Sequence, residues 1–147
     1  MTIGRTMLAA AAALGLLASC SGDIEAASLC EAVEDAAVDR VLGDSQLETF
    51  SVDPLDECVW TSNESPEQSV TLRIERVPDA ALFVEHAIEA TDPDRVERLG
   101  LGEESVMFFG EALLGRHGDR VALVTSTLDV DLLVPVLDEA LVQLAAP

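Results

Sequence analysis

The sequence of 147 residues predicts an α+β fold in which an antiparallel sheet is covered by helices. Three observations lead to this prediction. Segments with the apolar spacing of amphipathic helices alternate with shorter apolar runs of strand length. The connections between the later runs are short enough for hairpins. The part of the chain that follows a removable N-terminal segment is the size of one domain.

The N-terminal segment has the layout of an export signal. Arg5 is its only charge, an apolar run covers residues 7–18, and small residues precede Cys20. The run is too short for a transmembrane anchor, because a span needs roughly 20 apolar residues. An ordinary cleaved secretory signal remains an alternative to the interpretation that follows.

The sequence Leu17-Ala18-Ser19-Cys20 resembles the lipobox of bacterial lipoproteins, in which a lipid is attached to the cysteine and the chain is cut just before it. The resemblance implies that residues 1–19 are a signal peptide and that Cys20 becomes the lipidated first residue, carrying acyl chains such as palmitate. It also implies a location on the extracytoplasmic face of the cell membrane. Two or more acyl chains hold a protein stably on a bilayer.

Cys30 and Cys58 remain once Cys20 is assigned to lipid. We predict that they form a disulfide, since a bridge can persist in an oxidising compartment. A metal or redox pair is the alternative, but the two residues form no Cys-x-x-Cys pattern and the chain has only two histidines. The chain-entropy model gives about 3.6 kcal/mol for closing a loop of this length.

The composition excludes several classes of function. The chain has 8 basic and 28 acidic residues, a formal charge of −20, which excludes simple electrostatic binding to nucleic acid. Anionic lipids should repel the domain as a whole, so the lipid on the chain must supply attachment. Every basic residue is arginine, and tyrosine is absent, which excludes lysine Schiff-base chemistry, a P-loop lysine and a tyrosine acid. Solubility or a general adaptation explains the acidity, with a functional anionic surface as the alternative.

We interpret residues 20–28 as the lipidated cysteine with a tether, and residues 29–147 as a single globular domain. The first predicted element is a helix over residues 29–42, which Gly43 ends. Its apolar stripe is Leu29, Val33, Ala37 and Val41.

The next predicted elements are strands. Cys58 and Trp60 lie two residues apart in a short strand, so both side chains point to one face. We expect Trp60 to pack in the core around the disulfide rather than to serve as a ligand platform. After a turn at residues 62–68, a second strand buries Val70, Leu72 and Ile74 on one face.

A helix then begins at Pro78 and Asp79. Its expected apolar stripe leaves His86 on the polar side and consists of Ala80, Phe83, Val84, Ala87 and Ile88.

The remaining runs of strand length are residues 96–99, 106–109, 112–114 and 121–125. Hairpin turns at Gly110-Glu111 and His117-Gly118-Asp119 would place His117 at an exposed tip. A last helix over residues 131–144 tolerates Pro135 near its first turn. Its expected buried residues are Leu133, Val136, Leu137, Ala140, Leu141 and Leu144.

Together with the lipobox, three short motifs resemble the small exported lipoproteins of actinobacteria that are catalogued as domains of unknown function. The motifs are Leu29-Cys30, Cys58-Val59-Trp60 and Gly100-Leu101-Gly102-Glu103. Similar exported domains have an α/β sandwich like that of the PsbP proteins, which the resemblance implies here as well. This family has no agreed activity, so the resemblance implies no site residues.

No motif predicts catalysis. Gly100-Leu101-Gly102 lacks the further glycine, the following helix and the cation of a phosphate loop, and we expect a turn between strands. His86 and His117 are the histidines that a Ser/His/Asp site could use, but the sequence has no Gly-x-Ser-x-Gly motif to present the serine. The acidic clusters at residues 53–57 and 129–131 do not form a calcium loop. We therefore predict no catalytic residue, no metal site and no cofactor, and the sequence leaves the ligand-binding residues unidentified.

The expected function is a non-catalytic envelope module, anchored through Cys20, that binds a ligand or a protein partner. The alternatives are a structural accessory subunit of a membrane complex and an extracytoplasmic enzyme. A binding module predicts a cleft or an exposed apolar patch beside the sheet. An accessory subunit predicts a flat apolar interface without a cavity.

Overall fold

The structure is a computed structural model that describes residues 26–147. Cys20, the segment before it and most of the expected tether lie outside the described residues, so the signal peptide and the lipidation stay predictions. The last three residues of the expected tether, 26–28, belong to the first helix. Within residues 26–147, none of the helices combines the length and the apolar character needed to cross a membrane.

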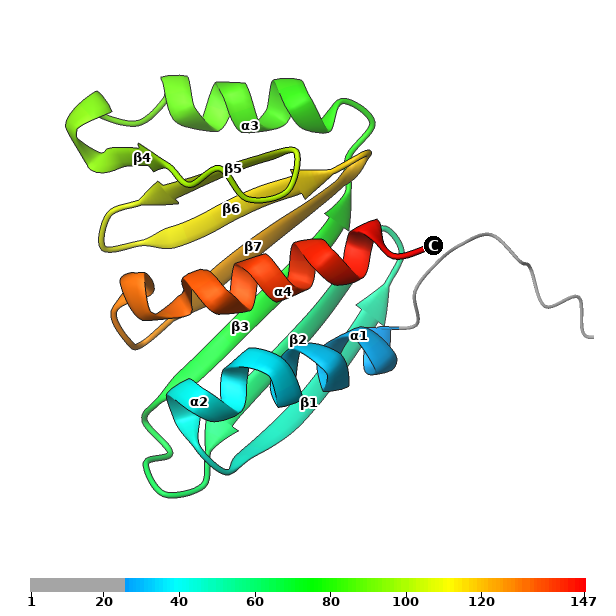
Figure 1. Ribbon diagram of the computed structural model, residues 1–147, viewed down its shortest axis with the longest axis vertical. Coiled ribbons are helices and arrows are strands. Elements are labelled where there is room, and N and C mark those ends of the chain that lie inside the picture. The colour runs from blue at the N-terminus through cyan, green and yellow to red at the C-terminus, as the bar shows by residue number, and fades with distance from the viewer. Residues whose placement is uncertain (1–25) are drawn as a thin grey trace, which may run out of the picture.

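Seven antiparallel strands form one sheet in the order β1-β2-β3-β7-β6-β5-β4 (Figure 1). The predicted α+β class is confirmed. The strands are β1 (Ser45–Val52), β2 (Leu55–Ser62), β3 (Ser69–Arg76), β4 (Val96–Arg98), β5 (Glu104–Phe108), β6 (Ala112–His117) and β7 (Arg120–Ser126).

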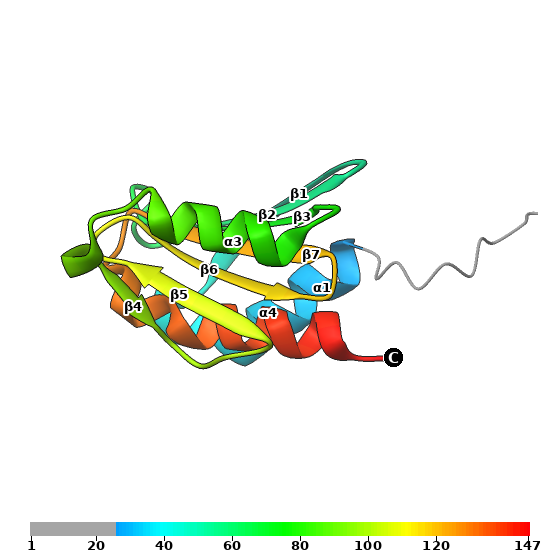
Figure 2. The same ribbon diagram turned by 90° about the horizontal axis from the view of Figure 1, so that it is seen from above.

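The helices cover both faces of this sheet (Figure 2). On one face lie the N-terminal helical segment and α4, and on the other face lies α3. The N-terminal segment consists of α1 (Ala26–Val33), a π-helical stretch (Glu34–Val38) and α2 (Asp39–Leu42), and it ends at Gly43, whose φ is 66°. The others are α3 (Ala80–Glu89), a 3-10 turn (Pro93–Arg95) before β4, and a 3-10 turn (Val130–Leu133) that leads into α4 (Val134–Ala145).

The larger core lies between the sheet and the helices α1 and α4. Cys30 and Cys58 form the predicted disulfide at its centre, with 5.7 Å between their Cα atoms. Trp60 is fully buried beside it, and its Nε1 donates a hydrogen bond to Glu34 Oε2 at 3.1 Å. The prediction that Trp60 packs around the disulfide is confirmed.

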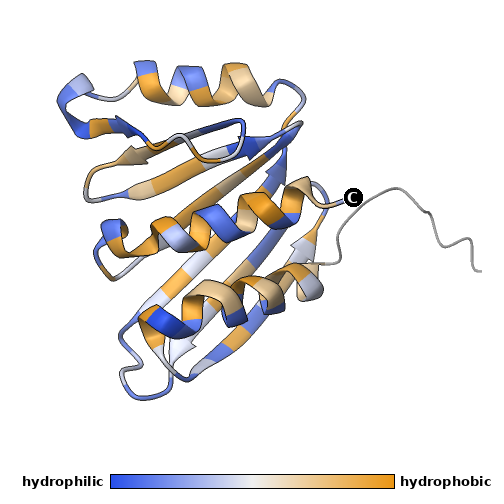
Figure 3. Cartoon of the chain, in the orientation of Figure 1, coloured by the Kyte–Doolittle hydropathy of each residue, from blue (hydrophilic) through white to orange (hydrophobic). Residues whose placement is uncertain are grey.

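Gly115 on β6 lets α4 approach the sheet closely. A Cβ atom at this position would lie 2.8 Å from Leu141 Cδ1 and 3.2 Å from Leu137 Cδ1, both on α4. All six residues expected to be buried in the last helix are buried. Figure 3 shows their hydrophobic colour alternating with polar residues along α4.

A smaller core lies under α3. Ala80 and Val84 pack on Val106, Leu114 and Val121. The Asp79 carboxylate begins the helix by accepting a hydrogen bond from the backbone N–H three residues later, at 3.2 Å.

The expected apolar stripe of α3 is buried only in part: Ala80 and Val84 are buried, and Ala87 and Ile88 are half-buried. Phe83 was expected in the apolar stripe, yet 45% of it is exposed. It faces β3 and β7, beyond which no helix of the described chain covers this side of the sheet. The buried face of α3 is therefore narrower than the spacing of its apolar residues predicts, and Phe83 borders an open surface.

Two further features differ from the expectations. The edge strand β1 was not predicted, because it lies mostly exposed and its apolar residues Leu47, Phe50 and Val52 do not alternate regularly with polar ones. His117 is the last residue of β6 and is half-buried, and only Gly118 and Asp119 form the turn. The expectation of His117 at an exposed tip was therefore wrong.

We predict that Cys30→Ala combined with Cys58→Ala lowers the free energy of unfolding by about 3–4 kcal/mol, because the bridge restricts the unfolded chain. Equilibrium denaturation of the two proteins measures the difference. Reductant should weaken the wild-type protein by a similar amount and leave the double variant unchanged. Equal stability of variant and wild type would contradict the prediction.

Candidate functional site

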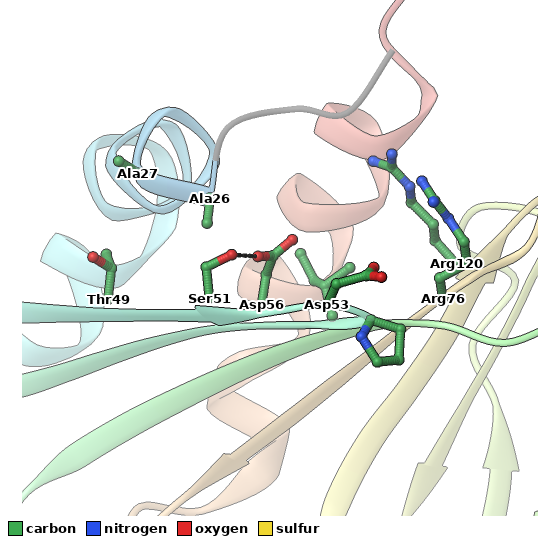
Figure 4. A pocket seen from close by; sticks show the side chains of 10 residues that line it. Ala26, Ala27, Thr49, Ser51, Asp53, Asp56, Arg76 and Arg120 are labelled. Carbon is green, nitrogen blue, oxygen red and sulfur yellow. Dashed lines mark hydrogen bonds between the residues drawn. The ribbon is translucent and has the colours of Figure 1, made fainter. Parts of the chain in front are cut away.

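A polar cavity of about 780 Å³ lies at one end of the sheet, beside the beginning of α1 (Figure 4). It is on the face that α1 and α4 cover. The lining residues are Ala26, Ala27, Thr49, Ser51, Asp53, Pro54, Asp56, Ile74, Arg76 and Arg120. They come from α1, from the β1–β2 hairpin, and from the adjoining ends of β3 and β7.

The β1–β2 hairpin supplies the acidic and hydroxyl groups. Its turn contains Asp53 and Pro54, which are joined by a cis peptide bond. On β1, Ser51 lies opposite Asp56 in the register, and its hydroxyl donates a hydrogen bond to the Asp56 carboxylate (Figure 4). The backbone N–H of Arg76 donates to Pro54 O at 3.1 Å, which ties the hairpin turn to the end of β3.

The cationic groups come from β3 and β7. Arg76 and Arg120 are direct partners in the antiparallel register, and Figure 4 shows both guanidinium groups on the same side of the sheet. Arg76 Nε also lies 3.4 Å from Asp119 Oδ2. Like charges placed directly opposite each other weaken a sheet. A chain with only eight basic residues nevertheless places two of them side by side at this cavity.

His117 lies on the neighbouring strand β6. It is the partner of Arg120 in the β6–β7 register. Its Nδ1 lies 3.7 Å from Glu103 Oε1, so a protonated imidazole would be paired with a carboxylate there. The cavity itself is lined by two arginines and two aspartates, which gives a balanced charge on a strongly acidic protein.

A cluster of ion pairs joins the β4–β5 connection to β6. Arg116 contacts Glu103 at 2.6 Å and Glu104 at 3.1 Å, and Arg98 contacts the same Glu104 at 3.1 Å. The glycine motif lies in this connection, where the N–H of Leu101 donates to Ser105 Oγ at 2.7 Å. The motif is thus the expected turn between strands, and acidic side chains follow it.

A second, apolar groove of about 290 Å³ lies under the edge of α3. It opens toward the part of the sheet that α3 leaves uncovered. The lining residues are Arg73, Glu75, Val77, Phe83, Ala87, Phe108, Leu114, Val121 and Leu123.

The other residues considered from the sequence are not brought together. His86 lies exposed on α3, away from His117 at the end of β6. Asp53 and Asp56 line the cavity, whereas Asp129 and Asp131 lie at the beginning of the last helical segment. Among the described residues no group of three or more His, Cys, Asp or Glu side chains could hold a metal ion.

Comparison with family models, with curated proteins and with solved structures finds no match to this chain. The resemblances to envelope lipoproteins and to PsbP proteins therefore stay predictions.

Sequence reasoning missed the arginine pair. Arg76 and Arg120 each lie at the end of a recognisable strand, but nothing local shows that these two strands are neighbours. The alternation of β3 would place Arg76 on the face of Ile74, which was the one available signal.

We predict opposite effects of two enlarging substitutions. Ala87→Leu should leave the free energy of unfolding unchanged or raise it by up to about 1 kcal/mol, because the added carbons enter the groove under α3. Gly115→Ala should lower it by about 1–2 kcal/mol, because two buried leucines on α4 occupy the space. Equilibrium denaturation measures both. A loss in Ala87→Leu as large as that in Gly115→Ala would show that the groove has no room.

Proposed function

We propose that the protein is a lipid-anchored, extracytoplasmic binding module. The cavity beside α1 takes a small ligand in which an anionic group, phosphoryl or carboxylate, lies next to hydroxyl groups. The observation that carries this proposal is the placement of Arg76 directly opposite Arg120 at the cavity of a protein with a formal charge of −20.

An anion at this end of the cavity would lie near both guanidinium groups. Each guanidinium has five N–H donors in a planar fork, which suits the oxygens of a phosphoryl or carboxylate group. Hydrogen bonds to ionised groups contribute roughly 1.5–3 kcal/mol each. The arginine pair therefore supports recognition of the ligand's anionic end.

The opposite part of the cavity favours hydroxyl groups. Asp53 and Asp56 are acceptors, and the hydroxyls of Thr49 and Ser51 can donate or accept. Carboxylates repel a ligand that is anionic throughout, so the ligand's negative charge should be confined to the arginine end. A phosphate ester of a polyol has this distribution of charge.

A binding module explains these features better than the two alternatives do. A cavity of about 780 Å³ supports ligand binding, whereas an accessory subunit calls only for a flat apolar interface. The cavity lining contains neither histidine nor cysteine among the described residues, so it offers no imidazole for acid–base chemistry and no thiol nucleophile.

The proposed anchor would hold the cavity near the membrane. Five residues separate Cys20 from Ala26, which lines the cavity. Six peptide steps of about 3.3 Å reach roughly 20 Å at most. Ligands that are embedded in the membrane surface or released from it would therefore be within reach.

We predict that the protein in mild detergent binds glycerol 3-phosphate and does not bind glycerol, as measured by isothermal titration calorimetry. Arg120→Gln should weaken the affinity at least about tenfold, which corresponds to about 1.4 kcal/mol. Arg40→Gln on α2 is the matched control, because it removes the same charge from an exposed position outside the cavity. Equal weakening in both variants would mean that only net charge matters, and the proposed site would be wrong.

The anchor has a separate test. The intact mass of the protein purified from its own membranes should correspond to a chain that begins at Cys20, carries acyl groups and lacks two hydrogens because of the disulfide. Cys20→Ser should abolish the acyl mass and release the protein from membranes. An unmodified wild-type chain would refute the anchoring proposal.

A further inference from the structure

We infer that the cavity end of the domain docks on the membrane that anchors the chain, so that the tip of the β1–β2 hairpin enters the headgroup region and Arg76 and Arg120 meet the phosphoryl group of a lipid. This inference rests on the proposed function and names the source of the ligand. Three independent observations support it.

The first observation is an exposed apolar hairpin. Phe50 is 54% exposed and Val52 is 56% exposed, and both precede the turn at Asp53. By the alternation of β1 they point to the face opposite α1 and α4. Figure 2 shows this hairpin extending past the helices. A projecting aromatic and aliphatic pair is suited to the boundary between headgroups and acyl chains.

The second observation is where the described chain begins. Ala26 lies at the same end of the domain as the hairpin turn, because it lines one cavity together with Asp53 and Pro54. Whatever the path of the five residues before it, a lipid on Cys20 holds this end of the domain closest to the bilayer. The hairpin tip and the anchor therefore approach the same surface.

The third observation is the distribution of charge. An acidic domain is repelled by anionic lipids, so the surface that approaches them should be less negative than the rest of the domain. Arg76 and Arg120 lie on adjacent strands at the cavity end and offset the charges of Asp53 and Asp56, so the lining is balanced in charge on a strongly acidic protein. At the far end of α4, Leu132 is 57% exposed but lies beside Asp129 and Asp131. Exposed apolar side chains thus occur at both ends, and at the cavity end they lie near the pair of Arg76 and Arg120.

The experiment uses the lipoprotein purified from its own membranes and reconstituted into vesicles of phosphatidylcholine and phosphatidylglycerol. Phe50→Trp places a fluorophore at the hairpin, and Leu132→Trp places a matched one at the opposite end. The buried Trp60 gives a constant background. Nitroxide-labelled lipids with the label at shallow depth then quench tryptophan that reaches the headgroup region.

When the vesicles are added, we expect the emission of Phe50→Trp to shift to shorter wavelength and to be quenched by the labelled lipids, while the emission of Leu132→Trp shows neither change. Val52→Trp should behave like Phe50→Trp, which would show that the result does not depend on a structural change caused by one substitution. Equal quenching at both ends, or none at the hairpin, would overturn the inference. A chain that carries no acyl group and does not enter the vesicles would overturn it as well.

The docking surface and the ligand site can fail separately. If glycerol 3-phosphate binds but the hairpin is not quenched, docking is wrong and the proposed function stands. If the hairpin is quenched but no phosphate ester binds, the cavity is not the ligand site. The hairpin tryptophan could also be shielded from the aqueous quencher acrylamide in native membranes but not in vesicles that contain the lipoprotein as their sole protein. That result would identify a protein partner and overturn the membrane assignment.

Discussion

The pairing of β3 with β7 holds the sheet together, and the rest of the molecule depends on it. Seven residue pairs join these two strands, which are more than forty residues apart in the chain. They connect the three-stranded unit of β1, β2 and β3 to the four-stranded unit of β4 to β7. The larger core crosses this junction, since Leu72 on β3 and Val124 on β7 both belong to it. Because the junction ends at Arg76 and Arg120, the contact that unites the two halves also creates the candidate site.

This dependence explains what could be predicted from the sequence. The helices and six of the seven strands have local patterns of apolar spacing, and the disulfide follows from the count of cysteines. Edge strand β1 lacks such a pattern because little of it is buried. Phe83 has the spacing of a core residue, but burial requires a covering element, which spacing cannot reveal. The arginine pair depends on which strands are neighbours, a property of the whole sheet.

The scarcity of basic residues makes their positions informative. Arginines at positions 73, 76, 95, 98 and 116 form ion pairs with carboxylates that lie close to the sheet. Pairs exposed to water contribute little to stability, typically about 0–1 kcal/mol. The main effect of these ion pairs is to place positive charges beside negative ones on a surface where most charged side chains are acidic. Arg76 differs from the others because it also lies directly opposite a second arginine, Arg120, at the edge of the cavity.

The position of the disulfide matters for how the domain bears mechanical load. Cys30 lies about one helical turn after Ala26 and is bonded covalently to Cys58 on β2. A force applied to the chain before Ala26 can therefore unwind little more than the first turn of α1. Beyond that turn the Cys30–Cys58 disulfide transmits the force to β2. The hydrogen bonds of the π-helical stretch and α2 lie behind this bond and are shielded from the tension. In a domain held by its N-terminus to a moving membrane, the helical segment after Cys30 would thus stay on the sheet, and only the first turn of α1, which borders the cavity, would respond to the tension.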